Sequence, residues 1–210
     1  MLSTPETEAL LLSLKVSLWA VAGSLPLAFA LAYALARGRF RGKALVEALV
    51  TLPLVLPPVV TGYLLLLAFG RHGPIGIWLE SWFGVSVMFR WTGAAIAAAI
   101  MALPLMVGAI RLSLEAVDRR LEVAARTLGA TRWGAFASVT LPLALPGIIA
   151  AAVLGFARAL GEFGATITFV SNIPGETQTL PIAIYSVLQQ PGGEAAAARL
   201  SVIAVALSLG

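Results

Sequence analysis

Long apolar blocks are the feature that most restricts how this chain can fold. They occupy residues 12–36, 48–70, 91–110 and 133–157, and each contains at most one charged residue. A helix needs about 20 mostly apolar residues to cross a hydrocarbon core of about 30 Å. Only 11% of the residues are charged, whereas soluble domains average about 25%. We therefore predict an all-α polytopic membrane protein with one transmembrane domain over residues 1–210.

The remaining segments complete a bundle of about five transmembrane helices. Residues 196–210 form a fifth apolar block that is too short to cross, so we expect an incomplete span there. The stretch before it is rich in proline, hydroxyl and amide groups, which predicts short helical pieces packed into the bundle. The N-terminus lacks the basic region of a cleaved signal peptide, so we expect the first block to be retained. Pro53, Pro57 and Pro58 interrupt the second block, which predicts either a static kink or part of a gate.

Lysine and arginine are distributed unevenly among the connections between the blocks. The first and third connections hold Arg37, Arg39, Arg41 and Lys43, and then Arg111, Arg119, Arg120, Arg126 and Arg132. The second and fourth hold Arg71, Arg90, Arg158 and Arg199. Because short connections rich in Lys and Arg stay on the cytoplasmic side, we predict that the first and third are cytoplasmic and that the N-terminus lies outside. These loops also account for the net charge of +4 without nucleic acid as a partner.

The third connection contains a helix-like pattern at residues 114–132. Apolar residues recur with the spacing of one helix face at Leu114, Val117, Leu121, Ala124, Ala125 and Leu128. Glu115 and Arg119 stand four residues apart, as do Glu122 and Arg126, which predicts two ion pairs on the opposite face. Gly129 favours the left-handed conformation that ends a helix. The residues alone leave open whether this amphipathic helix lies on lipid headgroups or docks to a cytoplasmic partner.

The same region resembles the EAA loop of ABC-transporter permeases. The matching positions are Ala124, Ala125, Gly129, Val139, Leu141 and Pro142. The glutamate position of that pattern is occupied here by Val123, and Glu122 stands one residue earlier. The resemblance implies a cytoplasmic coupling helix that rests in a groove of an ATPase subunit. The residues it assigns to coupling are Glu122, Ala124, Ala125, Arg126, Gly129, Leu141 and Pro142.

A second resemblance covers nearly the entire chain. The run GEFGATITFVSNIPGETQTLP, together with TLPLVLPPVVTGYLLL and LLLSLKVSL, is similar to the molybdate permease family, which is related to sulfate and tungstate permeases. This implies a type I ABC importer permease in a bacterial or archaeal cytoplasmic (inner) membrane. It further implies a homodimer, two copies of an ABC ATPase, and a periplasmic or extracellular oxyanion-binding protein. The expected function is ATP-driven import of an oxyanion by alternating access, with molybdate first and sulfate or tungstate as alternatives.

The sequence lacks the groups that catalysis would need. It contains no G-x-x-x-x-G-K-[ST] phosphate loop, no cysteine and a single histidine, His72. We therefore predict a transporter subunit that is not an enzyme, with no catalytic or metal-binding residues and no cofactor of its own. ATP and Mg would be bound by the partner ATPase, which would carry out the hydrolysis.

A tetrahedral anion requires a hydrated path lined with hydrogen-bond donors, because a bare charge in the bilayer centre costs at least several kcal/mol. The candidates are Thr166, Thr168, Ser171, Asn172 and Arg158. Glu162 stands four residues after Arg158 and is expected to pair with it. Short polar side chains also commonly form hydrogen bonds between membrane helices, and the sequence leaves both roles open.

Two other classes of protein fit the pattern less well. A transporter driven by an ion gradient would need ionisable groups inside its spans. The uncharged cores at 16–36, 48–70, 91–110 and 133–157 contain no acidic or basic residue. A purely structural membrane subunit would have no use for a docking helix that ends in this glycine and Leu-Pro.

Overall fold

A computed structural model of the chain describes residues 3–209. Within that range the chain forms helices and turns without any strand, which confirms the all-α class. The elements in order are α1 (Thr4–Arg37), α2 (Lys43–Val55), α3 (Pro58–Phe69), α4 (Pro74–Phe83), α5 (Trp91–Ala116), α6 (Arg119–Thr127), α7 (Arg132–Ala135), the π-helix η1 (Phe136–Thr140), α8 (Leu141–Leu160), α9 (Gly164–Val170), α10 (Leu180–Leu188) and α11 (Glu194–Leu209).

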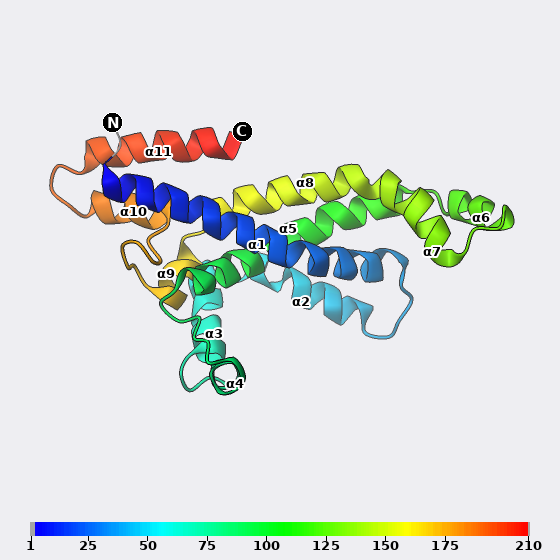
Figure 1. Cartoon of the computed structure of the whole chain (residues 1–210), viewed down its shortest axis with the longest axis horizontal. Coiled ribbons are helices and arrows are strands. Elements are labelled where there is room, and N and C mark those ends of the chain that lie inside the picture. The colour runs from blue at the N-terminus through cyan, green and yellow to red at the C-terminus, as the bar shows by residue number, and fades with distance from the viewer. Residues whose placement is uncertain (1–2, 210) are drawn as a thin grey trace.

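Three helical segments are long and apolar enough to cross a membrane: α1, α5 and the continuous stretch Arg132–Leu160 that joins α7, η1 and α8. They run side by side along the length of the molecule (Figure 1). The bent pair α2 and α3 adds a fourth span if it is counted as one. These four correspond to the four predicted blocks. The predicted incomplete span 196–210 falls on α11, which has 16 residues.

Helix α5 forms the centre of the bundle. In the apolar window of α5, 61% of the residues are buried, against 28% in α1 and 22% in the Arg132–Leu160 stretch. Alanines dominate the buried face, and they allow the neighbouring backbones to approach closely. Gly147 and Gly155 of α8 have the same effect, because a Cβ at either position would collide with Ser113 or Met106 of α5. Van der Waals packing of small residues therefore holds α1, α5 and α8 together.

The second predicted span is broken rather than straight. The axes of α2 and α3 meet at 114°, so that α3 projects away from the three long helices (Figure 1). Pro57 and Pro58 explain the break. A residue before proline is restricted to extended conformations, and Leu56 accordingly has a ψ of 141°. The redirected α3 packs against α9, where a Cβ on Gly62 would lie 2.6 Å from the carbonyl oxygen of Ala165.

The segment between α8 and α11 contains the short helices α9 and α10, as the sequence predicts. Their irregular connections are tied to the bundle by hydrogen bonds. The backbone N–H of Leu180, at the start of α10, donates to Oγ of buried Ser13 on α1 at 2.6 Å. The hydroxyl of Thr177 donates to the carbonyl of Ser171 at 2.9 Å. Side chains therefore satisfy backbone groups where no regular helix does.

The amphipathic region 114–132 is divided, contrary to the single apolar stripe that its pattern predicts. Leu114 belongs to the end of α5 and is fully buried, and Val117 is also buried. The chain leaves the helical conformation at Val117, whose ψ is 118°, and restarts at Arg119. Leu128, at the other end of the pattern, is 89% exposed. The apolar residues before the break are buried, whereas Leu121 and Leu128 after it are exposed, so they do not share one buried face.

Candidate functional site

Helix α6 has a well-defined beginning and end. Asp118 caps its N-terminus by accepting a hydrogen bond from the backbone N–H of Arg120 at 2.9 Å. At the other end the N–H of Ala130 donates to Ala125 and the N–H of Gly129 donates to Arg126, both at 3.1 Å. This pair of bonds is the Schellman motif, and it requires a left-handed residue. Gly129 has a φ of 95°, which confirms the predicted cap.

Much of the surface of α6 is exposed, including two large apolar side chains. Leu121 is 47% exposed and Val123 is 58% exposed. Ala124 and Arg126 of the predicted coupling set are also exposed, while Ala125 is half-buried. A soluble helix normally turns its apolar side inward. The exposed apolar residues of α6 therefore form a surface suited to contact with another molecule.

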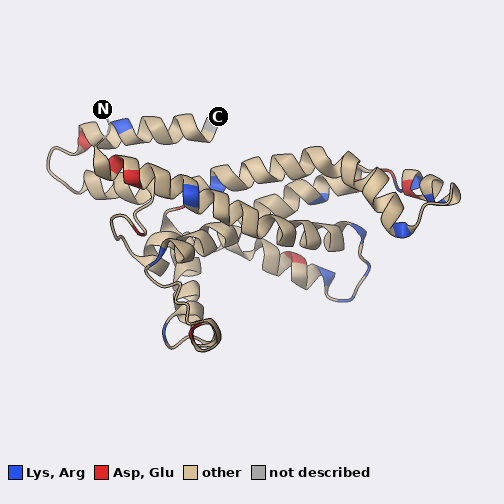
Figure 2. Ribbon diagram, viewed as in Figure 1, with Lys and Arg blue, Asp and Glu red and all other residues tan. Residues whose placement is uncertain are grey.

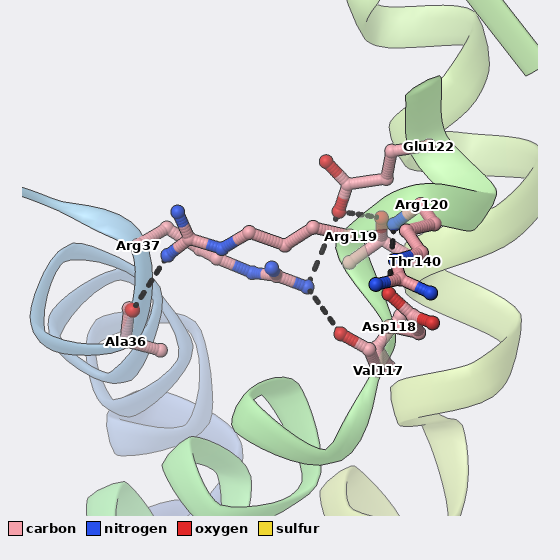
Figure 3. A network of polar contacts seen from close by, with 8 residues as sticks. All are labelled: Ala36, Arg37, Val117, Asp118, Arg119, Arg120, Glu122 and Thr140. Atoms are coloured by element: carbon pink, nitrogen blue, oxygen red, sulfur yellow. Dashed lines mark hydrogen bonds and ion pairs between the residues drawn. The ribbon is translucent and has the colours of Figure 1, made fainter. Parts of the chain in front are cut away.

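Glu122, which is less exposed than Leu121 and Val123, holds α6 in place by polar contacts (Figure 3). Glu122 Oε1 accepts a hydrogen bond from the hydroxyl of Thr140 at 2.5 Å and lies 3.3 Å from Nη2 of Arg37. The same Nη2 donates to the carbonyl oxygen of Val117 at 3.3 Å. Glu122 thus joins α6 to the end of α1 and to the residue that precedes α8.

The two ion pairs predicted within this region are wrong. Glu122 bonds to Arg37 and Thr140 instead of Arg126. Glu115 pairs with Arg111 at 2.8 Å, one turn back on α5, because the break at Val117 separates it from Arg119. For both glutamates, the contact that forms in the folded chain differs from the ion pair that sequence spacing predicts.

Leu141 and Pro142 begin α8 directly after the π-helix. Proline has no N–H with which to continue the α-helical ladder. Just before Pro142 the helix is wider than an α-helix, because the N–H of Leu141 donates to the carbonyl of Phe136, five residues back. Insertions of this kind are frequent at functional sites. The π-helix also ends at Thr140, the buried residue that bonds to Glu122.

Sequence reasoning misses Arg37 and Thr140 as members of this site. The sequence presents Arg37 only as one of several basic loop residues, although it is the last residue of α1 and its side chain is 11% exposed. Thr140 is the last hydroxyl before the long apolar run of α8. In both cases the available signal is a polar residue that stands next to an uninterrupted run of apolar residues.

The residues proposed for the anion path differ in burial and in their polar partners. Arg158 pairs with Glu162 at 2.6 Å, as predicted. The carboxylate of Glu162 is 2% exposed and also accepts a hydrogen bond from the N–H of Ala165 at 2.8 Å. Thr166 is buried, and the hydroxyl of Thr168 donates to the carbonyl of Gly164 in its own helix.

Ser171 and Asn172 lie in the turn that follows α9. Ser171 has a φ of 67°, which is uncommon for a residue other than glycine. The side-chain amide of Asn172 donates to Ser186 at 2.7 Å, and Asn172 accepts from Gln178 at 3.0 Å. Both residues are exposed, and the side chain of Asn172 holds the turn against α10.

Positive charge is concentrated at the end of the molecule that carries α6. Figure 2 shows lysine and arginine in the loop after α1 and around α6 and α7. We call this the basic end, and it comprises Arg37, Arg39, Arg41, Lys43, Arg119, Arg120, Arg126 and Arg132. The termini and the turn between α10 and α11 lie toward the opposite end (Figure 1). The candidate coupling residues are therefore at the end where the basic loops meet.

Comparison with known proteins places the chain in a transporter family. Residues 24–209 match the family described as binding-protein-dependent transport system inner membrane component. The chain belongs to this family. It is an ABC importer permease and a multi-pass protein of the inner membrane.

Among its relatives are two proteins named molybdenum transport system permease protein ModB. The one from Escherichia coli (strain K12) is 61% identical over 208 residues, which cover 99% of this chain and 91% of that protein. The one from Haemophilus influenzae is 58% identical over 204 residues, covering 97% and 89%. Of the solved structures, a bacterial alginate ABC transporter in complex with an alginate pentasaccharide-bound periplasmic protein superposes with a TM-score of 0.77 and 20% identity, covering 99% of this chain and 75% of that one. This likeness confirms the predicted fold class.

Proposed function

We propose that the chain forms the translocation path of an ATP-driven importer for molybdate. The names of its close relatives support this substrate, since their similarity covers almost the entire chain. Tungstate and sulfate have the same tetrahedral shape and charge. They are the alternatives that a transport assay must separate.

The coupling to ATP occurs through α6. The observation that carries this proposal is that α6 exposes two large apolar side chains, Leu121 and Val123, while Glu122 between them is fixed by Arg37 and Thr140. The exposed surface of α6 docks in a groove of a separate ATPase subunit that binds ATP and Mg and hydrolyses ATP. Ala124, Ala125 and Arg126 contribute to this contact, and Gly129 fixes where the helix ends.

Force applied to α6 reaches the spans through short connections. The Schellman turn leads through α7 and η1 to Leu141 and Pro142, the first residues of α8. Helix α8 packs along α5, so a shift at α6 changes the packing of the central helices. Packed helices have discrete arrangements, and a partner that binds one arrangement better shifts the balance between them. A shift between two such arrangements of the spans would produce alternating access.

The assembly comprises two copies of this chain, two ATPase subunits and an external oxyanion-binding protein. The basic end then faces the cytoplasm and the N-terminus lies outside, in accordance with the distribution of Lys and Arg. The relative with a bound periplasmic protein supports a binding-protein partner. Tight recognition belongs to that partner, because a translocation path must release its substrate.

The anion path passes the α8–α9 junction and uses hydroxyl and amide donors. We assign Thr166, Thr168, Ser171 and Asn172 to it. Arg158 contributes less positive potential than an unpaired arginine would, because Glu162 lies 2.6 Å from it. Weak donors without a strong fixed charge suit transient passage of a dianion.

Uptake in proteoliposomes tests this function. Vesicles would contain this chain and its ATPase, with the oxyanion-binding protein and radiolabelled molybdate outside. We expect uptake that requires ATP and persists when proton and sodium gradients are collapsed. Excess unlabelled molybdate should suppress it, whereas sulfate at the same concentration should not. Uptake driven by an ion gradient without ATP would contradict the proposal, and stronger competition by sulfate or tungstate would change the assigned substrate.

A further inference from the structure

The last turn of α1 is bonded to both sides of the break that precedes α6. Arg37 Nη2 donates to the carbonyl oxygen of Val117, before α6, and lies 3.3 Å from Glu122 Oε1, within α6. In return, Nη2 of Arg119 donates to the carbonyl oxygen of Ala36 at 3.5 Å. Figure 3 shows these contacts meeting between the two helices. Residues 80 or more positions apart in the chain thus form one network.

Arg37 carries the least exposed charge of this network. Its side chain is 11% exposed, against 31% for Glu122. A guanidinium withdrawn from water needs a compensating carboxylate, and removal of one partner leaves an unbalanced buried charge. Glu122 is the carboxylate in contact with it. The nearby Asp118 accepts from the backbone of Arg120 at the start of α6.

The link between α1 and α6 depends mainly on these side chains. The backbone of α6 lies chiefly against α7 and η1. The hydroxyl of Thr140 reinforces that side by bonding to the same Oε1 atom that faces Arg37. Helix α1 in turn packs along α5 and α8. Without the contacts of Arg37 and the weaker hydrogen bond from Arg119 to Ala36, α6 would be connected to α1 only through other elements.

We propose that Arg37 is a positioning residue that fixes α6 to the end of α1, so that α1 moves together with α6 during transport. The inference rests on the proposed coupling function of α6 and adds a route from α6 to the first span. Arg37 acts through Glu122 and touches neither substrate nor ATPase. Glu122 correspondingly serves as an internal tether, and Val123, 58% exposed, occupies the outward position that the family pattern gives to glutamate.

A mutant cycle in the proteoliposome assay tests whether Arg37 and Glu122 act as a pair. We expect Arg37→Gln and Glu122→Gln each to lower ATP-dependent uptake about tenfold or more, while ATP hydrolysis by the complex stays within about twofold of wild type. The double variant should be no worse than the poorer single variant. Arg41→Gln is the matched control, because Arg41 is an exposed arginine four residues later, in the loop that follows α1. Strictly additive losses, or normal uptake in Arg37→Gln, would overturn the inference.

A distance measurement tests the positioning itself without relying on transport. The chain has no cysteine, so spin labels can be attached only at Arg39→Cys and Arg120→Cys, one beside α1 and one on α6. We expect a single narrow intramolecular distance that stays the same with and without nucleotide when a cysteine-free ATPase is bound. Adding Arg37→Gln should broaden or lengthen it, and adding Arg41→Gln should not.

Two results of this measurement would overturn the proposal: a distance that changes with nucleotide in the chain with native Arg37, or a distance unaffected by Arg37→Gln. The effect of Arg37→Gln can be recorded on the purified chain without ATPase. A failure of the proposed function, seen as absence of ATP-dependent uptake in the wild-type complex, therefore remains distinguishable from a failure of this inference.

Discussion

Gly129 illustrates how one backbone conformation can determine where a helix ends, here the proposed docking helix α6. Its φ of 95° permits the two hydrogen bonds that end α6. A side chain in the left-handed region costs about 1–2 kcal/mol. We expect Gly129→Ala to impose this cost on the end of α6 and to lower ATP-dependent uptake several-fold, with the protein still inserted in the membrane.

Gly42 provides a matched control for the Gly129 experiment. It has a φ of 90°, and a Cβ added there would meet no atom within 4 Å, so Gly42→Ala carries a similar conformational cost. It lies in the loop before α2, away from α6. Uptake by Gly42→Ala should therefore stay close to wild type. Equal losses in the two variants would mean that strain alone, and not the geometry of α6, causes the defect.

Glu162 is the acidic residue on which the α8–α9 junction depends. It is 3% exposed, pairs with Arg158 and accepts the N–H of Ala165. Glu162→Ala leaves the buried N–H of Ala165 and the partly exposed guanidinium of Arg158 without their partner, and an orphaned buried donor costs about 1–3 kcal/mol. We expect a clearly lower Tm in detergent. Glu8→Ala, which removes an exposed carboxylate, should leave the Tm almost unchanged. An unchanged Tm for Glu162→Ala would show that the ion pair does not stabilise the junction.

The helices show which parts of the fold a sequence can reveal. The spans within α1, α5 and α8 are predictable because the length of an apolar run is a local property. The prolines predict that the second block is interrupted, and Gly129 predicts the end of α6. The 114° angle between α2 and α3 is different. It depends on how α3 packs against α9, and the sequence contains no local record of that contact.

The polar contacts of α6 are beyond prediction for a related reason. Spacing of four residues favours Glu122 with Arg126, and a pair of this kind contributes about 0.2–0.5 kcal/mol. The fold instead brings Arg37 and Thr140 to Glu122 from two other elements. These contacts with less exposed groups stabilise Glu122 more than a weak, exposed pair with Arg126 would. The end of α6 at Gly129 is predictable from its pattern, but the direction in which Glu122 faces is not.

The crossing of α3 and α9 allows the role of close helix packing to be measured. A Cβ at Gly62 would lie 2.6 Å from the carbonyl oxygen of Ala165 and 2.8 Å from Cβ of Thr168. We expect Gly62→Ala to push the helices apart and to lower the Tm, because overpacking typically costs about 1–3 kcal/mol. Gly23 of α1 has no atom within 4 Å of a Cβ. Gly23→Ala should leave the Tm unchanged or raise it slightly. A Tm for Gly62→Ala equal to that of Gly23→Ala would refute this account of the crossing.

The molecule as a unit has chemically different ends. The basic end carries the loop after α1 and helix α6, and the apolar residues of α6 lie exposed among these arginines. The opposite end holds the turn between α10 and α11 (Figure 1). Lysine and arginine near the ends of spans resist translocation across the membrane. The charge distribution therefore predicts that the basic end faces the cytoplasm, which the proposed docking of α6 to an ATPase also requires.

This orientation can be tested with two single cysteines in a chain that otherwise has none. Leu128 is 89% exposed at the end of α6, and Gln190 is exposed in the turn after α10. In intact cells, we expect a thiol reagent that cannot cross the membrane to label Gln190→Cys and to spare Leu128→Cys. Permeabilised cells should label both, which controls for reactivity. Labelling of Leu128→Cys alone in intact cells would invert the topology and separate α6 from any cytoplasmic ATPase, because a helix outside the membrane cannot receive the force of ATP hydrolysis inside.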